Sequence, residues 1–222
     1  MNGIGGLLPV PFGMLGSVTY RLETAMGALT VDHMTASGHE WDGLVRIWRE
    51  TDAPEGCKVE IIEGIVTVAP PPSNAHNDIA DLVQRELYQV IPMQWGIYQT
   101  LGTAVPSRDG LYIPDIAVAP KAVLRAEEGN YIPAAAAELI VEITSKSNAS
   151  NDRIKKAAGY AQAGVPLYLL IDNWAPGGPT ITLYGEPQGD VYRVLRAGKF
   201  GDQIELPDPF DLSLDTSEFP VG

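Results

Sequence analysis

The sequence predicts a mixed α/β fold in which a central mixed β-sheet is flanked by helices. One observation is residues 138–172, which read as a buried strand, a polar loop, a helix and a second buried strand. A helix that crosses between two apolar strands of one sheet makes those strands parallel neighbours. A second observation is that short runs typical of strands stand on both sides of a segment with helical apolar spacing. The order of elements therefore indicates a mixed α/β core.

Length and composition fit a single soluble domain with an N-terminal extension. The chain has 222 residues, of which 45% are hydrophobic, and we expect one domain over 38–222 after a poorly ordered extension at 1–37. No run approaches the roughly 20 apolar residues that cross a bilayer, so no membrane partner is expected. Met34 precedes a polar stretch typical of a domain start, so we expect 1–33 to be an upstream extension or an over-long start assignment. With Cys57 as its single cysteine, the chain is expected in a reducing cytoplasm.

The charge balance argues against a strong grip on nucleic acid. The net charge is −13, whereas a protein that holds a phosphate backbone usually presents a basic face. The basic residues are nevertheless gathered locally, and between 142 and 160 they are Lys146, Arg153, Lys155 and Lys156. Two interpretations stay open: a basic strip on an acidic body, or a solvated helix face that balances the acidic remainder.

The first elements are a helix and a hairpin. Apolar residues at helical spacing predict a short amphipathic helix over 41–50. The run CKVEIIEGIVTVAP has short strand-like halves on both sides of Glu63-Gly64, a turn dipeptide of the hairpin kind. A longer helix follows, with Ser73 or Asn74 as its cap and Pro92 as its stop.

The middle of the chain predicts two further strands. They cover 97–105 and 111–119 and are separated by a turn at 108–110. Pro114 lies inside the second strand and favours an edge position or a bulge, because proline removes a ladder donor. A helical piece at 121–128 leads to the strand, helix and strand of 138–172. The chain closes with the runs ITLYG, VYRVLRAG and QIELPDPFDLSLD.

Two carboxylates in strand-like runs are the first candidates for chemistry. Asp115 follows Pro114, and Glu142 interrupts the apolar run LIVEI, where an unpaired charge is costly to bury. Two carboxylates about 4 Å apart repel by about 4 kcal/mol at an effective dielectric near 20, so they need a cation or a shared proton. Mg²⁺ meets that need with oxygen ligands and retained waters. The alternatives are that Asp115 caps a bulge and that Glu142 pairs with a Lys or Arg.

These pieces together resemble a known nuclease family. Pro-Asp, a Glu in a following strand, and a helix with Lys and Tyr before a strand that ends in Asp look like the PD-(D/E)XK nuclease superfamily. More narrowly, the chain from about 41 to 214 resembles the Uma-type family of putative restriction endonucleases. The matching pieces are VEIIEG, His76 after PPPSNA, YIPDIAV, ELIVEITS, and Asp152, Lys156 and Tyr160 in DRIKKAAGYAQAGVPLYLLID.

The resemblance implies a restriction-endonuclease-like domain that hydrolyses DNA phosphodiesters with Mg²⁺, or Mn²⁺, held by Asp115 and Glu142. It also implies an acidic residue at Glu60. His76, in the first turn of its helix, is a further candidate to act on water or phosphate. The simpler interpretations are an exposed hairpin residue for Glu60 and a capping or packing role for His76.

The lysine of the site is ambiguous. The superfamily pattern expects it two residues after Glu142, where this chain has Thr144; in the narrower family it is moved to the helix, which indicates Lys156. Lys146 is held in reserve, because 142, 144 and 146 share one face of a strand. Asp152 and Tyr160 lie one turn before and after Lys156, in line with it. An apolar stripe of Ile154, Ala158 and Ala161 puts Lys156 on the opposite face, which equally suits a solvent-exposed ion pair.

Three functions follow from these patterns. The first is a magnesium-dependent DNA endonuclease, for which a homodimer is the expectation because it cuts two strands. The second is a binding or regulatory module that kept the fold and lost the chemistry, which the acidic charge and Thr144 favour. The third is a hydrolase of small phosphate esters, for which an acidic surface is no obstacle.

Overall fold

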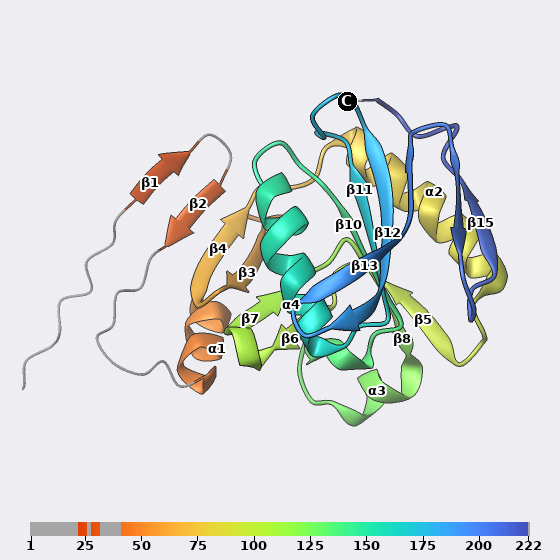
Figure 1. The fold of residues 1–222 in the computed structure, drawn as a ribbon. Helices are drawn as coiled ribbons and strands as arrows, with labels where there is room; N and C mark the ends of the chain where they lie inside the picture. Colours follow the sequence, from red (N-terminus) through yellow and green to blue (C-terminus); the bar gives the residue numbers. More distant parts are fainter. Residues whose placement is uncertain (1–21, 26–27, 32–40, 222) are drawn as a thin grey trace, which may run out of the picture.

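The computed structural model describes residues 22–25, 28–31 and 41–221 and has the predicted mixed α/β architecture (Figure 1). Within these ranges the strands form a seven-stranded sheet, a six-stranded sheet and a two-stranded hairpin. The seven-stranded sheet has the order β1-β2-β4-β3-β7-β6-β9 and the six-stranded sheet the order β13-β12-β11-β10-β8-β5. Both sheets are mixed, because β6 and β9 are parallel in the first and β10 and β11 in the second, while the other pairs are antiparallel.

The elements have the following bounds. The first sheet consists of β1 (Leu22–Ala25), β2 (Ala28–Val31), β3 (Lys58–Ile62), β4 (Ile65–Ala69), β6 (Gly102–Val105), β7 (Gly110–Tyr112) and β9 (Tyr131–Pro133). The second consists of β5 (Trp95–Tyr98), β8 (Ile116–Pro120), β10 (Leu139–Ile143), β11 (Leu167–Asp172), β12 (Thr180–Gln188) and β13 (Val191–Lys199), and the hairpin of β14 (Gln203–Leu206) and β15 (Leu212–Asp215). The helices are α1 (Trp41–Glu50), α2 (Asn74–Val90), α3 (Lys121–Ala126) and α4 (Ala157–Ala163), with short helical turns η1 (Pro106–Arg108), η2 (Ala134–Ala136) and η3 (Asn151–Lys156).

The predicted N-terminal extension falls mostly on residues that the structure does not describe. The two ranges that are described within it, β1 and β2, pair antiparallel with each other, and β2 also pairs with β4. The rest of 1–37 lies outside the described residues, so its lack of order stays a prediction. Among the described helices, none is long and apolar enough to span a membrane.

The local signals at the start of the domain are confirmed. Glu63 and Gly64 both have positive φ, 50° and 78°, which is the backbone of the tight turn that joins β3 to β4. The helix α2 begins after Ser73, whose Oγ accepts the backbone N–H of His76 at 3.2 Å. It ends at Val90, two residues before Pro92. The cap fixes the backbone of His76 at the start of α2 and so the position from which its side chain extends.

The two strands predicted for the middle of the chain are wrong, because each is divided between the two sheets. Residues 97–105 contain the end of β5 and all of β6, and residues 111–119 contain parts of β7 and β8. At the second division Pro114 has no N–H to donate, and the N–H of Ile113 donates at 2.7 Å to Oε1 of the Glu60 side chain in β3 instead of to a backbone carbonyl. Asp115 therefore lies where the chain passes from one sheet to the other, rather than inside a strand.

The parallel pair β10–β11 is confirmed and separates two hydrophobic clusters. Leu139, Val141 and Ile143 pack in the cluster that contains α2, whereas Ile140 packs in the cluster that contains α4. The two helices therefore cover opposite faces of the six-stranded sheet (Figure 1). Because side chains alternate along a strand, Glu142 shares the face of Ile140 and points toward the helix that carries Lys156.

The apolar stripe predicted for the crossing helix is wrong at its start. Residues 151–156 form a π-helix, in which each turn is about one residue wider than in an α-helix, before α4 continues. Ile154 is 65% exposed, whereas Lys156 is 4% exposed. Lys156 therefore points into the protein from this wider turn, which is one of the two orientations that α-helical spacing left open.

Gly159 is required by the way α4 packs on β7. A Cβ at this position would lie 2.5 Å from Oη of Tyr112, whose side chain is fully buried. We expect Gly159→Ala to lower the free energy of unfolding by about 1–3 kcal/mol through overpacking, although alanine favours helix. Gly43→Ala in α1, where nothing lies within 4 Å of the added Cβ, is expected to raise it by up to about 1 kcal/mol. Urea unfolding followed by circular dichroism measures both, and a stabilised Gly159→Ala would contradict the packing argument.

Candidate active site

Asp115 is held by contacts from three different elements. Its Oδ2 accepts the backbone N–H of Ile143 at 2.7 Å, and its Oδ1 contacts Nζ of Lys58 and lies 3.0 Å from Nε2 of His76. The carboxylate is 7% exposed. Burial by itself opposes ionisation, but Lys58 and His76 together hold the pKa of Asp115 well below its usual range. Asp115 is therefore ionised at neutral pH and fixed in orientation.

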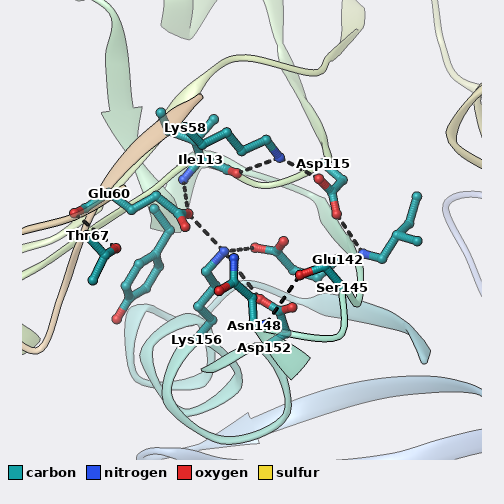
Figure 2. Close-up of polar contacts among 12 residues, drawn as sticks. Lys58, Glu60, Thr67, Ile113, Asp115, Glu142, Ser145, Asn148, Asp152 and Lys156 are labelled. Carbon is teal, nitrogen blue, oxygen red and sulfur yellow. Dashed lines mark hydrogen bonds and ion pairs between the residues drawn. The ribbon is translucent and has the colours of Figure 1, made fainter. Parts of the chain in front are cut away.

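A second group of charges surrounds Lys156. Its Nζ lies 2.8 Å from Oε1 of Glu60, 3.2 Å from Oε1 of Glu142 and 3.3 Å from Oδ1 of Asp152 (Figure 2). The hydroxyl of Tyr160 donates to the same Oε1 of Glu142 at 3.0 Å. All four charged side chains of this group are at most 5% exposed. Lys156 is thus a buried cation that forms ion pairs with three carboxylates, and it is not part of an exposed ion pair on the helix surface.

Two of the carboxylates around Lys156, Glu142 and Asp152, resist ionisation. Burial raises the pKa of Glu142 well above its usual value, Lys156 opposes the rise, and Asp152, Asp115 and Glu60 add to it by repulsion. Burial likewise raises the pKa of Asp152 to about 6, again against the pull of Lys156. Burial alone would lower the pKa of Lys156, but the three carboxylates raise it well above the ordinary value. The lysine therefore stays charged at neutral pH. A further cation in the pocket would stabilise the ionised form of Glu142 and Asp152.

All of these side chains except Tyr160 line one pocket of about 230 Å³. The pocket is lined by four carboxylates, Glu60, Asp115, Glu142 and Asp152, and by three lysines, Lys58, Lys156 and, at its rim, Lys146. The carboxylates outnumber the lysines by one, and a hard divalent cation with oxygen ligands would favour their ionised form. The site residues predicted from sequence, Asp115, Glu142, Lys156, Glu60, His76, Tyr160 and Asp152, are therefore brought together, and their catalytic roles stay a prediction.

The donor set fits a metal that keeps several of its waters. Within the part of the chain that the structure describes, no group of three or more His, Cys, Asp or Glu side chains forms a ready metal cage. The ammonium of Lys156 stands where Glu60, Glu142 and Asp152 converge. Mg²⁺ commonly binds through only one or two protein carboxylates and retains water on its other positions. Asp115, which directly precedes β8, and Glu142, on the adjacent strand β10, supply that number.

Lys58 is the pocket residue that the sequence reasoning missed. Its Nζ contacts Oδ1 of Asp115 and donates to the carbonyl of Ile113 at 3.2 Å, and its side chain is 23% exposed. A signal was present in the sequence, because Lys58 precedes Glu60 by two positions and so shares its face of β3. Lys58 is more accessible from the pocket than Lys156, whose side chain is 5% exposed.

The reserve lysine lies away from the carboxylates. Lys146 is exposed, and its Nζ lies over the ring of Trp174, 5.8 Å from the ring centroid. Thr144, at the position where the superfamily pattern expects a lysine, is buried and donates its hydroxyl to Oδ1 of Asp172 at 2.9 Å. Asp172 also receives a salt bridge from Arg153 at 2.6 Å. The structure thus gives Thr144 a structural partner and places Lys146 at the rim of the pocket.

The comparisons with known proteins agree with this arrangement. A model of the Uma2 family, described as a putative restriction endonuclease, matches residues 44–217. No curated protein matches the chain. A crystal structure of a putative nuclease belonging to DUF820 from Anabaena variabilis is similar with a TM-score of 0.62 and 20% sequence identity, over 82% of this chain and 97% of that chain. The structural likeness shows a shared fold, and the family match, which covers more than half of the chain, shows that this protein belongs to the Uma2 family of putative restriction endonucleases.

Proposed function

We propose that this protein is a metal-dependent endonuclease that hydrolyses DNA phosphodiester bonds in the pocket between β3, β8 and β10. The observation that carries the proposal is the meeting of four buried carboxylates and three lysines in one pocket of a chain from a family of putative restriction endonucleases. Asp115 and Glu142 would hold Mg²⁺, with Mn²⁺ as the alternative ion. When bound, such an ion lowers the pKa of a coordinated water and neutralises charge that develops on the phosphate.

The other roles in the proposed reaction are assigned to residues that bind or orient groups in the pocket. Asp115 is kept ionised and oriented by Lys58, His76 and the Ile143 N–H, so it presents a charged ligand without rearrangement. Tyr160 and Lys156 orient Glu142 through its Oε1. Lys58 is the accessible cation, and we assign it the contact with a non-bridging phosphate oxygen. The deeply buried Lys156 keeps three carboxylates in place and acts as a positioning residue.

Cleavage is expected to depend on added metal. Protein treated with a chelator should leave labelled single-stranded DNA and supercoiled plasmid intact, and Mg²⁺ or Mn²⁺ should restore cleavage. Because burial raises the pKa of Glu142, one of the two proposed ligands, metal binding should also release a proton and tighten as the pH rises. Calorimetry in two buffers of different ionisation enthalpy measures this release independently of cleavage.

The outcomes separate the proposed function from its alternatives. Protein that binds neither metal in calorimetry and cuts no DNA contradicts the endonuclease. DNA binding without metal binding or cleavage would instead support a regulatory module. Hydrolysis of a model phosphodiester without DNA binding at low salt would support a small-ester hydrolase. Dimerisation and a cytoplasmic location stay predictions from the sequence.

A further inference from the structure

Trp174 is an aromatic side chain at the rim of the candidate active site. It is 44% exposed and lines the same pocket as Asp115, Glu142 and Lys156. An exposed tryptophan gives up the stability that burial of a large apolar surface provides, so its position beside a catalytic pocket calls for a reason. The wall of the same pocket also carries Pro70, Pro71 and Pro72, which add apolar surface.

The backbone of Trp174 is fixed by a network of hydrogen bonds around Asp172. Asp172 ends β11, and its Oδ1 accepts the N–H of Trp174 at 3.2 Å and the hydroxyl of Thr144 at 2.9 Å. Arg153 donates to both oxygens of Asp172, at 2.6 and 2.8 Å, and to the carbonyl of Trp174 at 2.8 Å. The network ties Trp174 to the end of β10 and to η3, the two elements that carry Glu142 and Lys156. The backbone that carries the indole is therefore fixed relative to the carboxylates.

A cation accompanies the indole. Nζ of Lys146 lies 5.8 Å from the ring centroid, which is close to the outer limit of a cation–π contact. Lys146 is exposed, so its ammonium can pair with a phosphate while a base stacks on the ring. An aromatic face next to a cation is the combination that binds single-stranded nucleic acid.

We propose that Trp174 and Lys146 form a subsite for one unpaired nucleotide of single-stranded or locally opened DNA, with the base stacked on the indole and a phosphate paired with the ammonium. The inference rests on the proposed nuclease function and names its substrate class. A base inside a duplex has both faces covered by its neighbours, so the indole selects for unpaired bases. A pocket of about 230 Å³ has the scale of one small ligand, not of a double helix.

The acidic charge of the chain also favours a single-stranded over a duplex substrate. Duplex binding relies mainly on contacts with phosphates, which a net charge of −13 disfavours. Stacking depends much less on net charge, and each stacked base contributes substantially to binding. A single-stranded substrate therefore reconciles an acidic protein with a nucleic-acid substrate.

Binding measured without metal tests the subsite directly. The wild-type chain in chelator should bind a fluorescent single-stranded oligonucleotide at least about tenfold more tightly than the blunt duplex of the same sequence. Trp174→Ala should weaken single-strand binding about tenfold or more, while Trp174→Phe retains most of it. Lys146→Ala should cause a smaller loss that shrinks as salt is added. Tyr88→Ala, which removes an aromatic residue that is 60% exposed on α2, is the matched control and should change nothing.

Intrinsic fluorescence provides a second measurement. Single-stranded DNA should quench the tryptophan emission of the wild-type chain, and Trp174→Phe, which retains Trp41, Trp48 and Trp95, should abolish the quenching. Duplex bound as tightly as the single strand, or single-strand affinity unchanged in Trp174→Ala, overturns the subsite. If the wild-type chain still cleaves DNA with metal, that result leaves the endonuclease intact. A wild-type chain that neither binds nor cleaves any DNA overturns both.

Discussion

Replacing Lys156 by methionine is expected to lower the free energy of unfolding by about 3–5 kcal/mol at pH 7. The methionine retains most of the volume of the side chain but removes the positive charge that lies within 3.3 Å of Glu60, Glu142 and Asp152. The three carboxylates are then buried without that cation, and removing one member of a buried ion group costs more than the group contributes when intact. Chemical denaturation at fixed pH measures the loss.

The neighbouring lysine supplies the control. Lys155 is 39% exposed and makes one ion pair with Glu63 at 3.4 Å, so Lys155→Met is expected to change stability by less than about 1 kcal/mol. Equal effects at 155 and 156 would contradict the burial that the π-helix produces. Comparing Lys155→Met with Lys156→Met therefore distinguishes an inward from an outward lysine at this point of the helix.

The cost of Lys156→Met is expected to diminish as the pH falls. An acid whose pKa is higher in the folded than in the unfolded protein favours folding at low pH, and this contribution is lost as the pH rises through the folded value. The pKa of Asp152 is already raised to about 6 by burial, and loss of Lys156 would raise it further. The difference from wild type should therefore be largest near pH 7–8 and smaller near pH 5. A difference that is constant with pH would show that repulsion among the carboxylates is not its cause.

Asp115→Asn and Glu142→Gln are each expected to reduce DNA cleavage by at least about 10²–10³-fold and to remove metal binding. Both changes retain the shape of the side chain and remove one charge from the pair that would hold the ion. Cleavage rates with Mg²⁺ and metal titration by calorimetry measure the two effects separately. Asp81→Asn, on the exposed face of α2 where Asp81 pairs with Arg85, is the control and should retain full activity.

The two substitutions should differ in stability. Asp115→Asn loses the ionic contact with Lys58 and the carboxylate oxygen that faces His76, and it should cost about 1–3 kcal/mol without metal. Glu142→Gln removes a buried carboxylate that repels Asp152, Asp115 and Glu60, so it should cost less. A folded variant that still binds metal and cleaves at the wild-type rate would remove that residue from the proposed site.

Local patterns determined much of the fold. The positive-φ turn at Glu63-Gly64, the cap at Ser73 and the parallel strands on either side of the crossing helix were all predictable, because each depends on residues that are close in sequence. The placement of Glu142 in a buried strand was predictable for the same reason. A charge inside an apolar run is visible in the sequence without knowledge of its partners.

Other features were decided by contacts between distant residues. The division of 111–119 between two sheets depends on the bond from the Ile113 N–H to Glu60, which is 53 positions away. The contact of Lys58 with Asp115 spans 57 positions. The inward orientation of Lys156 depends on carboxylates from β3 and β10 and on a π-helix, whereas α-helical spacing left an exposed and an inward lysine equally open.

The sequence by itself thus determined the α/β class, the order of most elements and the two carboxylates proposed for the metal. Only the tertiary structure decided that Lys58 joins the pocket, that Lys156 is buried and that Trp174 stands at the rim. The physical reason is that periodicity and turn chemistry report the local backbone and its burial. The partner of a buried charge is set by the pairing of strands and by the register of a helix, which long-range packing determines.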